Sequence, residues 1–307
     1  MSSGRRIVDL WAEFQAMPER QLFEKIRTFQ YSLTIFEGNY RELRKILLWQ
    51  ANDPEAKQLW YLPNQHLLHT FLKEVARLLH NYVAAAQSLL DHTRRHHQAL
   101  YEDSRLFPEY NDEVNRRFAT NRLATFVKGL RQYCQHYEFP PVASVLSPSA
   151  GEPGHSSRIL LDSDKLREFS GWKAPAKEFL KDAGDTIDLL EVIDDHHKMV
   201  VDFHRWLESR QREIHARDFQ RVAEKQREIE SLDIRDTLRS VLASFPDGPW
   251  DPDDYFRYIL SPAQWAELNS YPPDSLERCD RLIAFIQTRA DIGDDLKSQI
   301  RSLYGVE

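Results

Sequence analysis

Two side chains that could act together on a phosphodiester, Arg131 and His136, stand five positions apart in this 307-residue chain. An arginine can hold a phosphate through two hydrogen bonds and stabilise charge that develops in a transition state. A histidine that titrates near neutral pH can move the proton of an attacking 2′-hydroxyl or of the leaving group. Together they could cleave RNA without a metal ion.

The elements that must position this pair begin with a predicted amphipathic helix over residues 111–136. At about 100° per residue its apolar side chains gather on one side, and Arg117, Lys128 and Arg131 fall within about 60° of one another on the other side. Residues 114–135 contain five basic side chains and no acidic one, whereas the whole chain has a net charge of −7. The pattern predicts a basic row that contacts substrate; a solvated helix face is the alternative.

The same helical wheel separates the two residues of the pair. Five residues at about 100° place His136 about 140° away from Arg131 around the helix axis. Either the arginine reaches around the helix or a second copy of the chain completes the site. The catalytic hypothesis therefore depends on a homodimer.

Residues 131–136, with the sequence RQYCQH, resemble the R-x4–6-H signature of the HEPN superfamily. Members of this family are small helical bundles that often act as metal-independent ribonucleases. The family commonly has an asparagine directly after the arginine, where this chain has Gln132. The long predicted helix ending at Leu89–Arg94 is similar to the helix that packs beside the motif helix in that family. The resemblance covers about residues 64–140.

The resemblance implies roles for individual residues. Arg131 would bind and polarise the scissile phosphate, His136 would transfer protons, and Gln132 would orient one of them by hydrogen bonding. Asp91 and His92 would line the same cleft. The implied function is RNA or nucleotide binding, with endoribonuclease activity of a toxin, defence or stress type. The family also contains members that bind without cutting, and Gln132 leaves that alternative open.

Hydrophobic periodicity predicts an all-α fold, a bundle of long amphipathic helices with one small β-hairpin and a C-terminal helical extension. A sustained stripe at helical spacing runs from Asn64 to about Leu90, and only 10 glycines occur in the chain. Breaks are expected at Pro18, at Gly38–Asn39 and in the polar stretch 91–97. Two short β-like runs around a Gly/Pro/Ser loop predict the hairpin.

Four segments follow from these patterns. Residues 1–140 are expected to form the HEPN-like bundle, and residues 141–162 the hairpin insertion. Residues 163–245 are expected to form long helices that pack on the bundle, one of them starting near Asp185. Residues 246–307 are expected to form a C-terminal helical subdomain, with the boundary at Phe245–Pro249.

Other chemistries find little support in the sequence. His92 and His96 have a spacing that a metal could use, but no HExxH motif or complete ligand set accompanies them, so we expect no metal site. Asp251, Asp253 and Asp254 are better explained by helix capping than by calcium binding. The phosphate-binding motifs GxGxxG and GxxxxGK[ST] are both absent, and no cofactor is expected. Cys134 is expected to be a packed thiol.

Composition places the chain among cytosolic globular proteins. No window approaches 18 uninterrupted apolar residues, and the N-terminus lacks a signal-peptide core, so neither membrane insertion nor secretion is expected. Two cysteines far apart in sequence indicate reduced thiols rather than a disulfide framework.

A second hypothesis is a non-catalytic helical scaffold that binds another protein. Residues 210–230 are rich in charge and poor in apolar side chains, which is typical of a solvated extension or a partner-facing arm. This segment and the C-terminal helices would then form the contact surface. The acidic overall balance and the missing asparagine after Arg131 favour this alternative.

Overall fold

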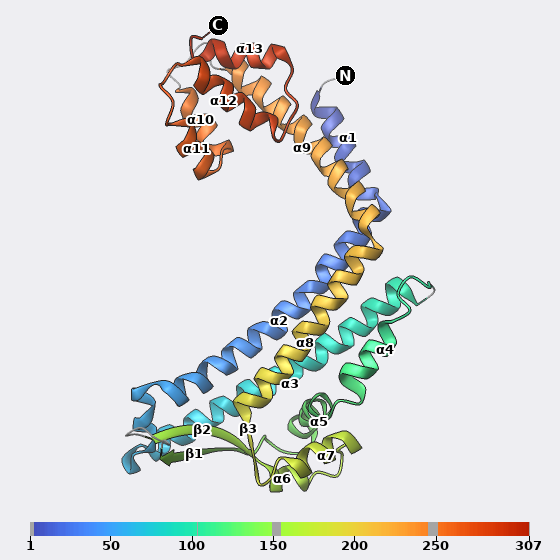
Figure 1. Ribbon diagram of the computed structural model, residues 1–307, viewed down its shortest axis with the longest axis vertical. Coiled ribbons are helices and arrows are strands. Elements are labelled where there is room, and N and C mark those ends of the chain that lie inside the picture. The colour runs from blue at the N-terminus through green and yellow to red at the C-terminus, as the bar shows by residue number, and fades with distance from the viewer. Residues whose placement is uncertain (1–2, 103, 149–154, 245–250, 307) are drawn as a thin grey trace. The chain divides into compact units, whose positions relative to one another are not determined.

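The protein is mostly helical, as the sequence predicts. Its structure, a computed structural model, describes residues 3–102, 104–148, 155–244 and 251–306. Over these ranges the helices are joined by one small antiparallel sheet of three strands (Figure 1). The all-α class with a small β element is therefore confirmed.

The elements share one chain order, which Figure 1 follows from blue to red. They are α1 (Ser3–Ala16), α2 (Pro18–Asn52), η1 (Pro54–Trp60), η2 (Leu62–Asn64), α3 (Gln65–Tyr101), α4 (Tyr110–Val114), η3 (Asn115–Ala119), α5 (Arg122–His136), β1 (Val142–Pro148), β2 (His155–Asp162), α6 (Ser163–Arg167), α7 (Ala174–Asp182), β3 (Thr186–Asp188), α8 (Leu189–Ile214), α9 (Ala216–Ser244), α10 (Pro252–Ile259), α11 (Pro262–Leu268), α12 (Leu276–Gln287) and α13 (Asp294–Leu303).

The chain forms two compact units. The central unit comprises residues 25–214, and the terminal unit comprises residues 1–24 and 215–307. Both units draw on segments that the four-segment division by sequence assigns differently, and that division stays a prediction. The boundary predicted at Phe245–Pro249 lies outside the described residues.

Three long helices, α2, α3 and α8, build the core of the central unit. Phe36 of α2 and Tyr82 of α3 are fully buried, with ring centroids 5.4 Å apart. The hydroxyl of Tyr82 lies 2.7 Å from Nδ1 of His196 on α8. Arg44 of α2 donates to Asp194 of α8 at 3.0 Å. Apolar contact and paired polar groups therefore join the three helices.

Two breaks predicted in these helices are wrong. Helix α2 runs through Gly38–Asn39, where the Asn39 side chain donates to the backbone carbonyl of Ile35 at 2.9 Å. Helix α3 continues past the polar stretch to Tyr101, which is 3 % exposed and packs against Phe107. In both places tertiary packing of the apolar face outweighs the local preference of polar residues or glycine for a helix end.

The predicted hairpin is confirmed and has a third strand. Strands β1 and β2 pair antiparallel with Val142 opposite Leu161, and β3 pairs with the other side of β2. The connecting residues 149–154 lie outside the described chain. The start of the following helix, predicted near Asp185, is wrong by a few residues. Residues 186–188 form β3, and Asp188 then accepts from the backbone of Leu190 at the start of α8.

Helix α5 is held between α3, α8 and the segment that contains α6 and α7. The backbone at Gly129 lies directly against the indole of Trp172, where a Cβ would meet ring carbons at 2.5 Å. Trp172 is 4 % exposed and donates from its ring nitrogen to the carbonyl of Leu166 at 2.6 Å. Its ring also stacks on Phe126, with centroids 5.4 Å apart. The indole has no free space to move into.

In the terminal unit, α1 packs along α9. Val222 and Ile229 of α9 are buried together with Phe14 of α1. Lys225 of α9 pairs with Glu13 at 3.2 Å. The predicted continuous, solvated extension over 210–230 is therefore wrong: the helix breaks at His215, and α1 supplies the partner for the few apolar residues of α9.

The C-terminal helices have the caps that the sequence predicts. Asp251 accepts from the backbone of Asp253, Ser261 forms a capping box with Gln264, and Ser275 caps α12. The four short helices and the end of α9 share one hydrophobic core. No helix among the described residues has the length and apolar content that crossing a membrane requires.

Two glycine substitutions test the packing of α5. Gly129→Ala should lower the free energy of unfolding by about 1–3 kcal/mol, since the new methyl group overlaps a buried indole. The matched control is Gly38→Ala in α2, where a Cβ would meet no atom within 4 Å. It should raise the free energy by about 0.5–1 kcal/mol, because alanine favours the helix. Urea unfolding of both variants measures the difference, and a Gly129→Ala protein as stable as wild type would contradict this packing.

Candidate functional site

The sequence-predicted site residues Arg131, Gln132 and His136 lie in the last turns of α5. Asn121 starts this helix by accepting from the backbone of Ala124 at 3.0 Å, and Tyr137 ends it three residues before Pro140. The apolar side of the helix, with Phe126, Leu130 and Tyr133, is fully buried. This packing fixes which side of α5 remains accessible.

The three residues have different environments. Gln132 and His136 are exposed, whereas Arg131 is half-buried. The Nε atom of Arg131 is buried without a hydrogen-bond partner in the described chain. Because α5 is a regular helix, His136 projects about 140° away from Arg131. Within one chain the helix does not bring the arginine and the histidine onto one side.

Two exposed aromatic side chains follow the motif and were missed in the sequence analysis. Tyr137 is 50 % exposed and Phe139 is 83 % exposed. Large aromatic side chains normally bury most of their surface in the core or at an interface. Their signal in the sequence is weak: two aromatic residues between a helix end and Pro140–Pro141, where no periodicity assigns them to the core.

The basic row predicted on one helix is interrupted. The chain forms α4, a π-helical turn (η3) and a break at Thr120 before Asn121 caps α5. Arg117 therefore lies on a different element from Lys128. It is tied to Glu113 at 2.9 Å and lies over the ring of Trp206 at 5.9 Å. The predicted continuous helix over 111–136 is wrong, because the asparagine cap outweighs the uninterrupted apolar spacing.

Ion pairs also neutralise most of the basic excess in this region. Arg116 and Arg117 both contact Glu113, and Arg122 contacts Glu178 and Asp182. Neither Lys128 nor Arg131 has an ion-pair partner among the described residues. These two cations, three residues apart on α5, carry the positive charge that remains available to a ligand.

Asp91 and His92 of α3 point to different neighbours. Asp91 accepts from Gln87 and from Arg94, each at 3.1 Å. His92 lies 2.8 Å from the hydroxyl of Ser32 on α2. The structure does bring α3 against α5, as the sequence predicts. The α5 residue that shares a cavity with the neighbours of Asp91 is Lys128, and Arg131 does not line that cavity.

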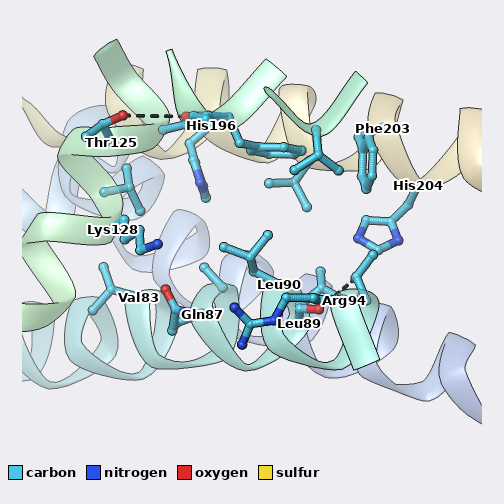
Figure 2. Close-up of a pocket in the computed structure, with 18 of the residues that line it drawn as sticks. Val83, Gln87, Leu89, Leu90, Arg94, Thr125, Lys128, His196, Phe203 and His204 are labelled. Carbon is cyan, nitrogen blue, oxygen red and sulfur yellow. Dashed lines mark hydrogen bonds between the residues drawn. The ribbon is translucent and has the colours of Figure 1, made fainter. Parts of the chain in front are cut away.

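This cavity of about 330 Å³ lies between α3, the α4–η3 segment, α5 and α8. Figure 2 shows Lys128 extending into it from α5 and Arg94 and Gln87 extending into it from α3. Phe203 and His204 of α8 form another part of its wall. Sequence analysis missed the cavity because its walls come from four elements that only the tertiary fold brings together.

Other chemistry is limited in the described part of the chain. No group of three or more His, Cys, Asp or Glu side chains there could hold a metal ion. Burial raises the pKa of the Cys134 thiol to about 12 and that of Cys279 to about 11. Both thiols are therefore protonated at neutral pH and are poor nucleophiles.

Comparisons with known proteins add no relative. No protein-family model, curated protein or solved structure matches this chain. The resemblance to the HEPN superfamily thus depends on the motif residues themselves.

Three buried histidines make the central unit sensitive to acid. Burial lowers the pKa of His96 and His204 to about 4 and that of His196 to about 3. Below the usual pKa of about 6.5 the unfolded chain binds protons that the native state does not bind, so stability is complete above pH 6.5 and falls as the pH decreases toward 4.

Replacing His204 by Asn should remove part of this dependence. Each such histidine contributes up to about 1.4 kcal/mol per pH unit below pH 6.5. Urea unfolding between pH 7 and 5 should therefore show a shallower loss of stability for His204→Asn than for wild type. His69→Asn, at an exposed position of α3, is the control and should keep the wild-type slope. Equal slopes in all three proteins would contradict neutral burial of His204.

Proposed function

We propose that this protein binds single-stranded RNA at the C-terminal end of α5, as a HEPN-like protein. Arg131 and Lys128 would contact phosphates, and Tyr137 and Phe139 would stack on bases. The observation that carries the proposal is the exposure of Phe139, 83 %, in the same short stretch as the exposed His136. Aromatic side chains beside cations are the usual means of binding unpaired bases.

The exposed aromatic side chains have an energetic cost without a ligand. Burying a phenylalanine side chain stabilises a protein by about 1.5–3 kcal/mol. Phe139 forgoes most of this gain. Stacking on a base recovers a comparable free energy, about 1–3 kcal/mol for each base. Every base has an aromatic face, so such a site selects unpaired strands rather than a sequence.

Cleavage would use Arg131 of one copy and His136 of another. His136 would take the proton of the 2′-hydroxyl as its oxygen forms a bond to phosphorus and the bond from phosphorus to the 5′-oxygen breaks. The leaving 5′-oxygen would take a proton from water, giving a 2′,3′-cyclic phosphate and a 5′-hydroxyl. Arg131 would stabilise charge on the phosphoryl oxygens, and Gln132 would orient one of the two side chains. A homodimer is needed because the two residues lie on different sides of α5.

Binding is tested with a fluorescent single-stranded RNA. Phe139→Ala should weaken binding by about fivefold or more, the equivalent of about 1 kcal/mol or more of lost stacking. The matched control is Tyr258→Ala, since Tyr258 is 89 % exposed on α10 of the other unit. Two phosphate contacts predict a slope of about −1.4 for log K against log salt concentration. RNA that binds Phe139→Ala and wild type equally would contradict the site.

Cleavage is tested by complementation. Arg131→Ala and His136→Ala should each leave RNA intact, and a mixture of the two should regain about a quarter of wild-type activity. Half of randomly mixed dimers are heterodimers, and each heterodimer holds one intact composite site of two. Products should carry 2′,3′-cyclic phosphates, and a substrate with 2′-deoxyribose at the cleaved position should resist. Binding without cleavage by wild type would leave the RNA-binding proposal and overturn the catalytic one.

The second candidate is a non-catalytic protein-binding scaffold. The exposure of Tyr258 on α10 favours it, because this ring is large, apolar and almost completely accessible. On this candidate, wild type neither binds nor cleaves RNA. The contact surface would then lie on the C-terminal helices rather than on residues 216–230, whose apolar side chains α1 covers.

A further inference from the structure

The cavity in the central unit has a dry, apolar interior. Its deepest lining includes Val83 and Leu89 of α3, Val127 of α5 and Phe203 of α8, each between 1 and 3 % exposed. At about 330 Å³ it falls within the lower range of natural ligand sites. Well-packed cores leave few voids of this size, so the cavity calls for an occupant.

The polar groups inside the cavity are uncharged. The Thr93 and Thr125 hydroxyls donate to the backbone carbonyls of Leu89 and Asn121 at 2.7 Å each. His196 pairs with Tyr82, and His204 has no hydrogen-bond partner in the described chain. Burial lowers the pKa of both histidines far enough to keep them neutral at pH 7. The interior therefore presents an uncharged surface.

The mouth of the cavity carries charge of a single sign. All of its charged lining residues are cations, namely Arg94, Lys128 and Lys173, and all three are exposed. Arg94 shares its charge with Asp91, whereas Lys128 and Lys173 have no ion-pair partner in the part of the chain that is described. In a chain of net charge −7, this is a local attraction for an anion.

We propose that the cavity binds an amphiphilic anion, such as a medium-chain carboxylate, with its apolar chain inside and its head group between Lys128, Lys173 and Arg94. An apolar pocket with a few convergent polar groups is the usual form of a small-molecule site. The cationic mouth selects against neutral and cationic amphiphiles of equal length. This inference is independent of RNA binding, because it depends on the cavity and not on Arg131, His136 or Phe139.

Three eight-carbon probes test the head-group preference on the full-length chain. Octanoate, octan-1-ol and octylammonium are titrated by calorimetry at pH 7.5. Octanoate should bind saturably with one site per chain, octan-1-ol several-fold more weakly, and octylammonium not at all. Equal binding of octanoate and octylammonium, or no saturable octanoate binding up to its solubility limit, would overturn the proposal.

Variants locate the site. Lys128→Gln should weaken octanoate about three- to tenfold and leave octan-1-ol unchanged, since exposed ion pairs contribute up to about 1 kcal/mol. Lys177→Gln, an exposed lysine on α7 outside the cavity lining, is the control and should bind octanoate as wild type does.

Filling the cavity should abolish binding of all probes. Ala86→Phe places a ring in the cavity from α3 and should remove octanoate binding while leaving RNA binding intact. If this variant does not fold, Ala119→Trp at the mouth provides the same test from η3. Octanoate binding that survives in the folded variant would overturn the proposal. RNA binding and octanoate binding can therefore fail separately.

Discussion

The contact between the backbone of Gly129 and the indole of Trp172 determines the placement of α5. Because glycine has no Cβ, the helix can approach the ring closely, and the ring is fixed in turn by its hydrogen bond to Leu166 and by its stack on Phe126. One side of α5 is thereby committed to the core. The side that remains accessible is the one with Lys128, Gln132 and His136, so a packing constraint on one face decides which polar groups can meet a ligand on the other.

The break before α5 has the complementary effect on the cavity. The Asn121 cap ends the π-helical turn and starts a new helix, so the α4–η3 segment and α5 do not continue as one rod. The space they share with α3 and α8 is the cavity. The same cap separates Arg117 from Lys128 and leaves Arg117 to a local ion pair with Glu113. Two candidate sites thus arise on one helix, one beside its C-terminal end and one against its middle.

Much of the fold could be predicted from the sequence, because long stripes at helical spacing require burial and cap residues mark helix starts. The hairpin and the starts of the helices capped by Ser261 and Ser275 were predicted correctly. The errors share one cause. Helix α2 continues through Gly38 and α3 continues past Asp91 because partners from distant segments bury their apolar faces. For the site, the sequence indicated Arg131 and His136, but the exposure of Phe139 and the walls of the cavity depend on tertiary packing that spacing does not contain.

Cross-linking tests the account's central claim most directly, namely that the end of α5 is an RNA-binding surface. Single-stranded RNA containing 4-thiouridine is irradiated with the full-length protein, and the cross-linked peptides are identified by mass spectrometry. The account predicts cross-links within residues 128–139, concentrated at Tyr137 and Phe139, that unlabelled single-stranded RNA competes away. Cross-links confined to the terminal unit, or none above the level of a double-stranded control, would contradict it.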